Sequence, residues 1–132
     1  QIPWIYNWAG APYKAQQVIR RILNEQYSSR VNGLPGNDDL GSMGAWYVFA
    51  CIGLYPEIPG IGGFTVNTPI FSSVKVHLPK GDIVIKGGSE KNIYIKSMKL
   101  DGKPYESTWI DWEQLSKGAV IDYVTSSKPD VK

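Results

Sequence analysis

The fold class is decided by residues 55–63, which read Tyr55-Pro56-Glu57-Ile58-Pro59-Gly60-Ile61-Gly62-Gly63. Two prolines and three glycines within these nine residues end a helix and begin a loop. Residues 1–55 have the apolar spacing of helices, whereas residues 56–132 alternate apolar and polar side chains as strands do. The sequence therefore predicts an α+β protein, in which a helical pair within residues 1–55 precedes a small antiparallel β-sandwich at residues 56–132.

Two helices are predicted before residue 56. The first begins near Pro12, whose fixed φ suits a first helical turn, and its apolar stripe continues to Tyr27. The second follows residues 37–39 and ends at Gly53; it is apolar on every side, and such a helix is normally buried all round. Because one other helix gives too little cover, we expect neighbours outside this chain. We expect that a single copy of the chain does not bury all the faces of Trp46, Phe49, Cys51 and Ile52.

The second half of the chain carries strand and turn signals. Residues 74–78 alternate apolar and polar side chains, as a strand with one buried face does. Asp101-Gly102 indicates a two-residue hairpin, because this dipeptide accepts the positive φ of a type I′ turn. Asp111 is placed to cap a short helical turn that ends at Gly118. Short strands separated by such turns are typical of a small antiparallel sandwich.

Composition excludes several classes of function. The 132 residues are 42% hydrophobic with a formal charge of +2, so they can form a core and lack the basic surplus of a nucleic-acid-binding protein. The longest apolar stretch, around Ala45 to Leu54, is too short to span a membrane. One cysteine, Cys51, excludes an internal disulfide, and one histidine, His77, excludes a multi-histidine metal site. We expect Cys51 to be an inert core residue and His77 to face solvent.

The stretch with the most chemical content is residues 36–44, where Asn37, Asp38 and Asp39 lie between glycines and before the apolar helix. The dipole and free N–H groups of a helix N-terminus favour an ionised carboxylate, which indicates a general base or a hard-cation ligand. The alternative is structural, because Asp and Asn are the commonest helix N-caps. Asp38 and Asp39 are neighbours in the sequence, so they cannot act as acid and base on opposite sides of one bond, and such a pair would need a distant second carboxyl group.

An aromatic cluster precedes the first helix. Trp4, Tyr6, Asn7 and Trp8 are residue types that line sugar-binding clefts, where ring faces stack on apolar C–H patches. Packing in the core is the alternative interpretation of the same rings. The candidate substrate-binding residues are Trp4, Tyr6, Asn7 and Asn37.

Three runs of residues resemble glycoside hydrolase family 92, the calcium-dependent exo-α-mannosidases. Residues 2–10, IPWIYNWAG, are similar to the family run PYLYNYAG, and residues 12–16, PYKAQ, are similar to P-x-K-T-Q. Residues 36–49, GNDDLGSMGAWYVF, resemble the family's G-[ND]-x-D-x-G-x-M-S-A-W-Y-V. The resemblance continues to residue 71 and, more loosely, to the end. Departures from the family pattern are Ala15 for Thr, Gly44 for Ser, and Asn37 where some members have a second Asp.

The resemblance implies an enzyme with a β-sandwich domain and an (α/α)₆ barrel. Residues 1–55 would be the last helices of the catalytic barrel and residues 56–132 the C-terminal β-sandwich region. The resemblance implies hydrolysis with inversion of configuration, with Asp39 as the general base. It implies that Asn37 and Asp38 support Asp39, fix the attacking water or orient the mannose. In the family, the general acid (a Glu) and part of the calcium shell precede the run at residues 2–10. We therefore expect a calcium-dependent enzyme whose remaining metal ligands lie upstream of Gln1, and no activity of this chain alone.

The predicted function is that of the C-terminal part of an inverting exo-α-mannosidase that removes terminal mannose from glycans. An α-1,2 linkage is favoured, although α-1,3 and α-1,4 stay open. The alternatives are a non-catalytic carbohydrate-binding or structural β module, and a family relative that has lost activity. Expected partners are mannose-containing glycans and the rest of the barrel, or a second copy of the chain through its apolar helix. Because the chain starts at Gln1 with no initiator Met and no signal-like segment, we expect a piece of a longer protein, periplasmic or secreted by resemblance.

Overall fold

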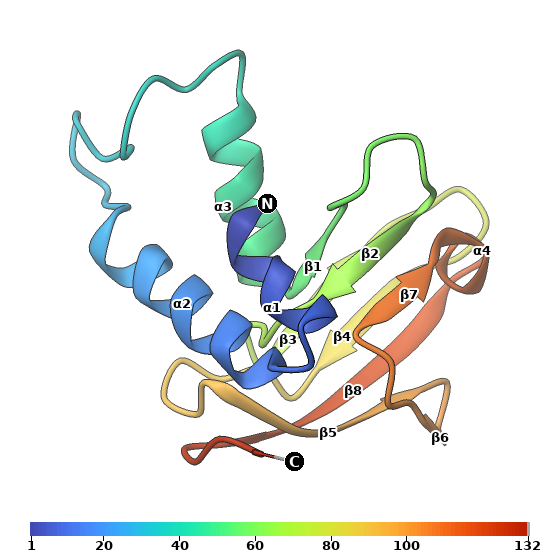
Figure 1. The fold of residues 1–132 in the computed structure, drawn as a ribbon. Coiled ribbons are helices and arrows are strands. Elements are labelled where there is room, and N and C mark those ends of the chain that lie inside the picture. The colour runs from blue at the N-terminus through green and yellow to red at the C-terminus, as the bar shows by residue number, and fades with distance from the viewer. Residues whose placement is uncertain (132) are drawn as a thin grey trace.

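A computed structural model describes residues 1–131 and has the predicted pair of long helices (Figure 1). Pro12 lies in the first turn of α2, and Gly53, with a φ of 87°, ends α3 in the left-handed conformation that glycine accepts. The chain also forms three short helical elements. The bounds are η1 Ile2–Trp4, α1 Ile5–Trp8, α2 Pro12–Glu25, α3 Ser42–Ile52 and α4 Trp112–Leu115.

The strands form two sheets that pack face to face. The smaller sheet has the order β1-β2-β7 and the larger sheet the order β3-β4-β8-β5-β6. The smaller sheet contains β1 Leu54–Tyr55, β2 Gly63–Val66 and β7 Trp109–Asp111. The larger sheet contains β3 Ser73–Val76, β4 Ile83–Lys86, β8 Ala119–Ser126, β5 Tyr94–Leu100 and β6 Lys103–Pro104. The α+β class is thus confirmed.

The predicted antiparallel sandwich needs one correction. Strands β4 and β8 pair in parallel, with Ile83 opposite Ala119 and Lys86 opposite Asp122, whereas the other strand pairs are antiparallel. Alternation of side chains fixes which face of a strand is buried but not the direction of its neighbour. The long connection from β4 to β8, which includes β5, β6 and α4, makes the parallel pairing possible.

The hydrophobic core lies between the two sheets, and a second cluster lies among the helices. Leu115 of α4 closes the sandwich core, and α4 begins with the predicted cap, in which Asp111 and Gln114 bond each other's backbone. The sandwich core contains Leu54, Val66, Ile83, Ile85, Met98, Leu100, Ile110, Leu115, Ala119, Ile121 and Tyr123. The helical cluster contains Trp4, Ala15, Ile19, Leu23, Ala50 and Cys51, which confirms Cys51 as a core residue.

Buried polar side chains hold the helices on the sheets. Asn7 Nδ2 donates to Thr65 Oγ1 at 2.9 Å and to the Val66 carbonyl at 3.0 Å. The Arg20 guanidinium of α2 donates to the carbonyls of Ser89 and Glu90 at 2.8 and 2.7 Å. Since these bonds connect residues far apart in the sequence, they hold α1 on β2 and α2 beside the connection between β4 and β5.

Helix α3 is only partly covered, as predicted. Its C-terminal turn is buried at Ala50 and Cys51, but Val48 is 57% exposed and Tyr47 is 38% exposed. Trp46, Phe49 and Ile52 are half-buried. Figure 1 shows α3 rising away from the sheets toward the α2–α3 loop. Within residues 1–131, none of the helices combines the length and hydropathy needed to cross a bilayer.

The Tyr123 hydroxyl offers a test of the sandwich core. This hydroxyl is buried away from solvent and makes no hydrogen bond within residues 1–131. Burial raises the pKa of the Tyr123 phenol. A buried hydroxyl without a partner is destabilising, so Tyr123→Phe should increase the free energy of unfolding by about 1 kcal/mol in urea titrations. Tyr105→Phe is the matched control, because the Tyr105 hydroxyl donates to the Trp109 carbonyl at 2.9 Å and its removal should lower stability. A loss of stability in Tyr123→Phe would contradict the assignment.

Candidate active site

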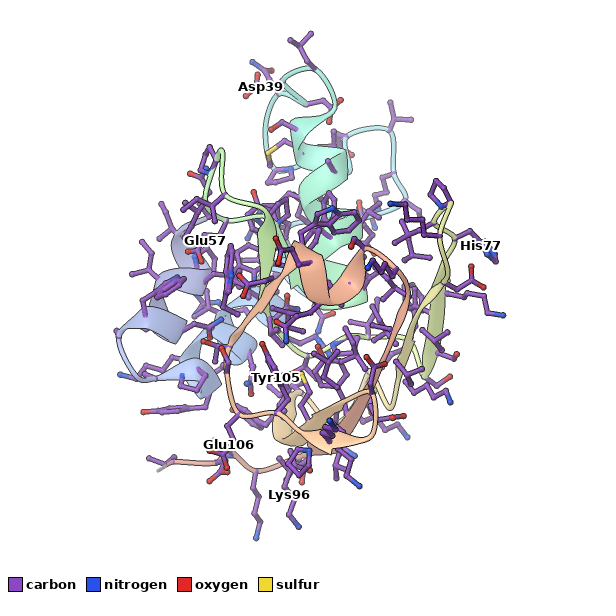
Figure 2. All side chains as sticks on the ribbon, turned by 90° about the vertical axis from the view of Figure 1, so that its right-hand side faces the viewer. Asp39, Glu57, His77, Lys96, Tyr105 and Glu106 are labelled. Carbon is purple, nitrogen blue, oxygen red and sulfur yellow. The ribbon has the colours of Figure 1, made fainter. Side chains whose placement is uncertain are left out.

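The predicted acidic loop lies at the free end of α3. Asp39, Leu40 and Gly41 have φ values of 50°, 60° and 88°, so three successive residues adopt the left-handed conformation. This conformation is uncommon outside glycine and turns the chain sharply into the helix. Figure 2 shows Asp39 at the tip of the molecule, beyond the first turn of α3. Non-glycine residues in such conformations are concentrated at functional sites, which makes this loop the candidate active site.

The two acids of the loop have different surroundings. Asp38 Oδ1 accepts the N–H of Gly44 at 3.1 Å and the Asp38 carbonyl accepts the N–H of Met43 at 3.1 Å, so Asp38 caps α3. Gly41 occupies the formal N-cap position and makes no side-chain bond. Asp39 is exposed, and its carboxylate has no hydrogen-bond or ion-pair partner within residues 1–131. The structural interpretation of this loop therefore applies to Asp38, and the Asp39 carboxylate is left free for chemistry.

A hollow of about 340 Å³ opens next to the first turn of α3, and none of Asn37, Asp38 and Asp39 lines it. Tyr27 and Tyr47 face it together with Gly44, and their rings are 4.9 Å apart between centroids. Tyr27 also donates to the Met43 carbonyl at 3.2 Å and stacks on Trp46, so it ties the end of α2 to the start of α3. Burial is the main cause that raises the pKa of Tyr27, and Asp38 contributes to the same shift. Helical periodicity identified Tyr27 only as part of an apolar stripe, and no local pattern indicated that it borders the acidic loop.

The predicted sugar-binding residues before α2 do not gather at this loop. Trp4 has no exposed surface; its ring stacks on Tyr55 at 4.1 Å and its Nε1 donates to Asn67 Oδ1 at 3.2 Å. Asn7 is 8% exposed and anchors α1 on β2. Within this chain Trp4 and Asn7 pack and bond structurally, and their contact with sugar stays a prediction. Tyr6 is exposed beneath the Lys14 ammonium, and Asn37 is exposed next to Asp38.

The predicted reaction needs a second carboxyl group opposite Asp39, and the buried Glu57 is engaged in another contact. Glu57, 9% exposed, is a buried acid, and its Oε2 accepts the indole N–H of Trp8 at 2.8 Å. Glu57 follows the far end of α3, a helix about 16 Å long at 1.5 Å per residue. Figure 2 shows Glu57 and Asp39 in different regions of the molecule. Because Glu57 is bonded to Trp8 in a different region of the molecule, we do not assign it as the partner acid of Asp39.

The described residues also lack a complete metal site. Within residues 1–131, no group of three or more His, Cys, Asp or Glu side chains is arranged to hold a metal ion. Asp38 already uses one oxygen for the helix cap, so the loop offers the Asp39 carboxylate and the Asn37 amide as free oxygen donors. These donors do not by themselves fit a calcium ion, which takes six to eight oxygens. His77 is solvent-exposed, as predicted, and its Nδ1 lies 2.9 Å from Asp82 Oδ1.

Several known proteins are similar to this chain in sequence and in fold. Residues 1–127 match the Glycosyl hydrolase family 92 catalytic domain. An "Uncharacterized secreted glycosidase" of Arthroderma benhamiae is 30% identical over 125 residues, which are 90% of this chain and 16% of that protein. A family GH92 alpha-mannosidase of Bacteroides thetaiotaomicron is 32% identical, with a TM-score of 0.92 over 98% of this chain and 18% of its own.

A further structure from the same bacterium, a family GH92 inverting mannosidase, is 28% identical with a TM-score of 0.90, over 97% of this chain and 18% of that chain. The 132 residues thus span about a sixth of the length of these relatives. The match extends through the helices, the acidic loop and both sheets. On the matched domain and on these likenesses, the chain belongs to glycosyl hydrolase family 92.

Proposed function

We propose that this chain is the C-terminal part of an inverting exo-α-mannosidase that removes terminal mannose from glycans, with α-1,2 linkages favoured. The observation that carries the proposal is the exposed Asp39 carboxylate, which has no partner while its neighbour Asp38 caps the helix. A relative of this fold, solved in complex with mannoimidazole, is named an alpha-mannosidase, which supports the choice of sugar. A non-catalytic sandwich module has no use for a free acid on a strained loop, so that alternative is less well supported.

In the proposed reaction, Asp39 is the general base. An ionised carboxylate accepts a proton from water, and the resulting nucleophile attacks the anomeric carbon from the face opposite the leaving group. A general acid protonates the departing glycosidic oxygen at the same time, and the product has the inverted configuration. In our proposal that acid comes from a part of the protein outside these residues. In this proposal Asn37, which is exposed two residues before Asp39, orients the mannose.

Calcium is part of the proposal only for the whole protein. We propose that the remaining calcium ligands come from parts of the protein outside these residues, while the Asp39 carboxylate stays available as the base. We further propose that the exposed face of α3, with Tyr47 and Val48, packs against the other helices of an (α/α)₆ barrel. Residues 1–55 would belong to that barrel, and residues 56–132 would form the C-terminal β-sandwich region. A periplasmic or secreted location is proposed from the name of the Arthroderma relative.

The proposal is tested on the whole protein that contains this sequence. Proton NMR should detect β-mannose as the first product from an aryl α-mannoside, because inversion converts the α configuration to β. Chelation with EDTA should abolish turnover, and added calcium should restore it. If the folded protein with calcium releases no mannose from any α-mannoside, the chain belongs to a relative without activity. Release of α-mannose first would contradict inversion.

The isolated chain should not hydrolyse mannosides. It carries the proposed base, but the general acid is proposed to lie outside these residues, and no cluster of metal-ligating side chains is present within residues 1–131. The check is an aryl mannoside assay of the purified 132-residue chain beside an Asp39→Asn preparation made in the same way. Equal background in both preparations is the expected result. Turnover by the unaltered chain that is absent from the variant would overturn the prediction.

A further inference from the structure

A second hollow, larger than the one beside Tyr27 and Tyr47, lies away from the acidic loop. It has a volume of about 480 Å³ and runs between the start of α2 and strands β5 and β6, with the residues that follow β6 as its rim. Hollows of this size hold small organic ligands in many proteins. Figure 2 shows three of its lining residues, Lys96, Tyr105 and Glu106, at the end of the molecule opposite Asp39. We call this hollow the β5–β6 groove.

A buried amide faces the β5–β6 groove. Gln16 lines the groove but is only 7% exposed, and its Oε1 accepts the N–H of Ile95 at 3.0 Å. The Nε2 of the same side chain has no partner within residues 1–131, and it is not among the atoms sealed from solvent. Because the bond to Ile95 fixes the side chain, Nε2 is a positioned donor that can be reached from the groove. Such a donor is stabilised by an acceptor such as a hydroxyl oxygen.

Two unpaired charges stand at the groove. Lys96 lies at the irregularity between Ile95 and Ser97, where β5 bulges against β8, and a bulge re-aims the side chain that it carries. Glu106 follows β6 on the opposite rim, and both side chains are exposed. Neither makes an ion pair within the described residues. The carboxylate of Asp130 also lines the groove. An ammonium and carboxylates at one groove recognise hydroxyl groups, which donate and accept hydrogen bonds, and charges of both signs do not favour an anionic ligand.

Aromatic rings supply the apolar part of the lining. Tyr13 and Tyr105 are half-buried at the groove, and the Tyr105 hydroxyl donates to the Trp109 carbonyl at 2.9 Å, which fixes the orientation of that ring. Ring faces next to placed amide, ammonium and carboxylate groups suit a ligand with apolar C–H patches and many hydroxyls. This combination describes a neutral sugar better than an anion, a metal ion or an apolar molecule.

We propose that the β5–β6 groove is a second saccharide-binding site, separate from the catalytic loop, that takes one or two neutral sugar units of a glycan. Gln16, Lys96 and Glu106 bond sugar hydroxyls, and the rings of Tyr13 and Tyr105 contact the apolar face of the sugar. Such a site holds a polymer near the enzyme without taking part in the reaction. We infer sugar binding from the residues that line the groove. The choice of mannan as the first probe rests on the proposed function.

The test measures binding of the whole protein, in the Asp39→Asn background, to soluble yeast mannan, β-glucan and galactan by affinity gel electrophoresis. The double variant Lys96→Met with Glu106→Gln should raise the dissociation constant for the polymer that retards the protein by about fivefold or more. This increase corresponds to the loss of one or two hydrogen bonds. Lys99→Met on the same strand and Glu113→Gln on α4 are matched controls outside the groove, and they should leave retardation unchanged.

The outcomes separate this inference from the proposed catalytic function. If β-glucan retards the protein in a groove-dependent way and mannan does not, the saccharide site stands and only the choice of mannan as its ligand fails. If the protein hydrolyses aryl mannosides but the double variant binds every polymer like its parent, the groove inference is overturned and the proposed catalytic function stands. A protein that none of the three polymers retards also overturns the groove inference. In the active background, the double variant should raise KM for mannan but not for the aryl mannoside.

Discussion

Asp39→Asn in the whole enzyme is expected to lower kcat by about 10²–10⁴-fold, because an amide cannot accept the proton of the attacking water. Asp38→Asn should have a much smaller effect on kcat, since an amide oxygen at this position can still accept the N–H of Gly44 and cap α3. The difference between the two variants is therefore the measurement of interest. It is obtained from steady-state kinetics on an aryl α-mannoside at saturating substrate.

Two further measurements identify the step that Asp39 serves. Mannose should still bind the Asp39→Asn enzyme, because the loss concerns the chemical step and spares ground-state contacts. Azide should restore part of the turnover by supplying a nucleophile that needs no deprotonation, and the product should be the inverted glycosyl azide. If Asp38→Asn is the inactive variant and Asp39→Asn keeps near-normal turnover, the assignment within the pair is reversed. If both variants keep it, the loop is only a helix cap.

Arg20→Met should lower the free energy of unfolding by about 3 kcal/mol or more, because hydrogen bonds from a charged donor are among the strongest in proteins. The Arg20 side chain is 4% exposed, and its guanidinium donates to carbonyls of Ser89 and Glu90, with longer bonds of 3.4 Å to Thr68 and Pro69. Burial lowers the pKa of Arg20, and nearby Cys51 and Glu90 oppose that shift. Removal of the guanidinium leaves carbonyls unpaired between α2 and the larger sheet.

Arg21 provides a matched control for this effect. It is the next residue on α2 but is exposed, so Arg21→Met should change stability by no more than about 0.5 kcal/mol. Arg20→Lys should be intermediate, because one ammonium cannot reproduce the planar set of donors that contacts several carbonyls at once. Urea titrations of the three variants supply the comparison. Equal stability of Arg20→Met and Arg21→Met would mean that water replaces the guanidinium at little cost.

The sequence by itself determined the local elements of this protein. Pro12 and Gly53 marked a helix start and a helix end, because each residue restricts or permits a particular φ. Asp101-Gly102 specified the β5–β6 hairpin, where both residues have positive φ, and Asp111 with Gln114 specified the cap of α4. The motif at residues 36–49 also indicated the family through a resemblance that the matched domain confirms. These signals act within a few residues, so they can be read without knowing the fold.

Only the tertiary structure decided how distant residues divide their roles. It buried Trp4 against Tyr55 and Asn67, made β4 and β8 parallel, and brought Arg20 to the carbonyls of Ser89 and Glu90. It also separated Asp38 from Asp39, which look alike in the sequence. The physical reason is that side-chain direction depends on backbone conformation. Three left-handed residues in succession direct the carboxylate of Asp38 to the N–H of Gly44 and leave that of Asp39 in solvent.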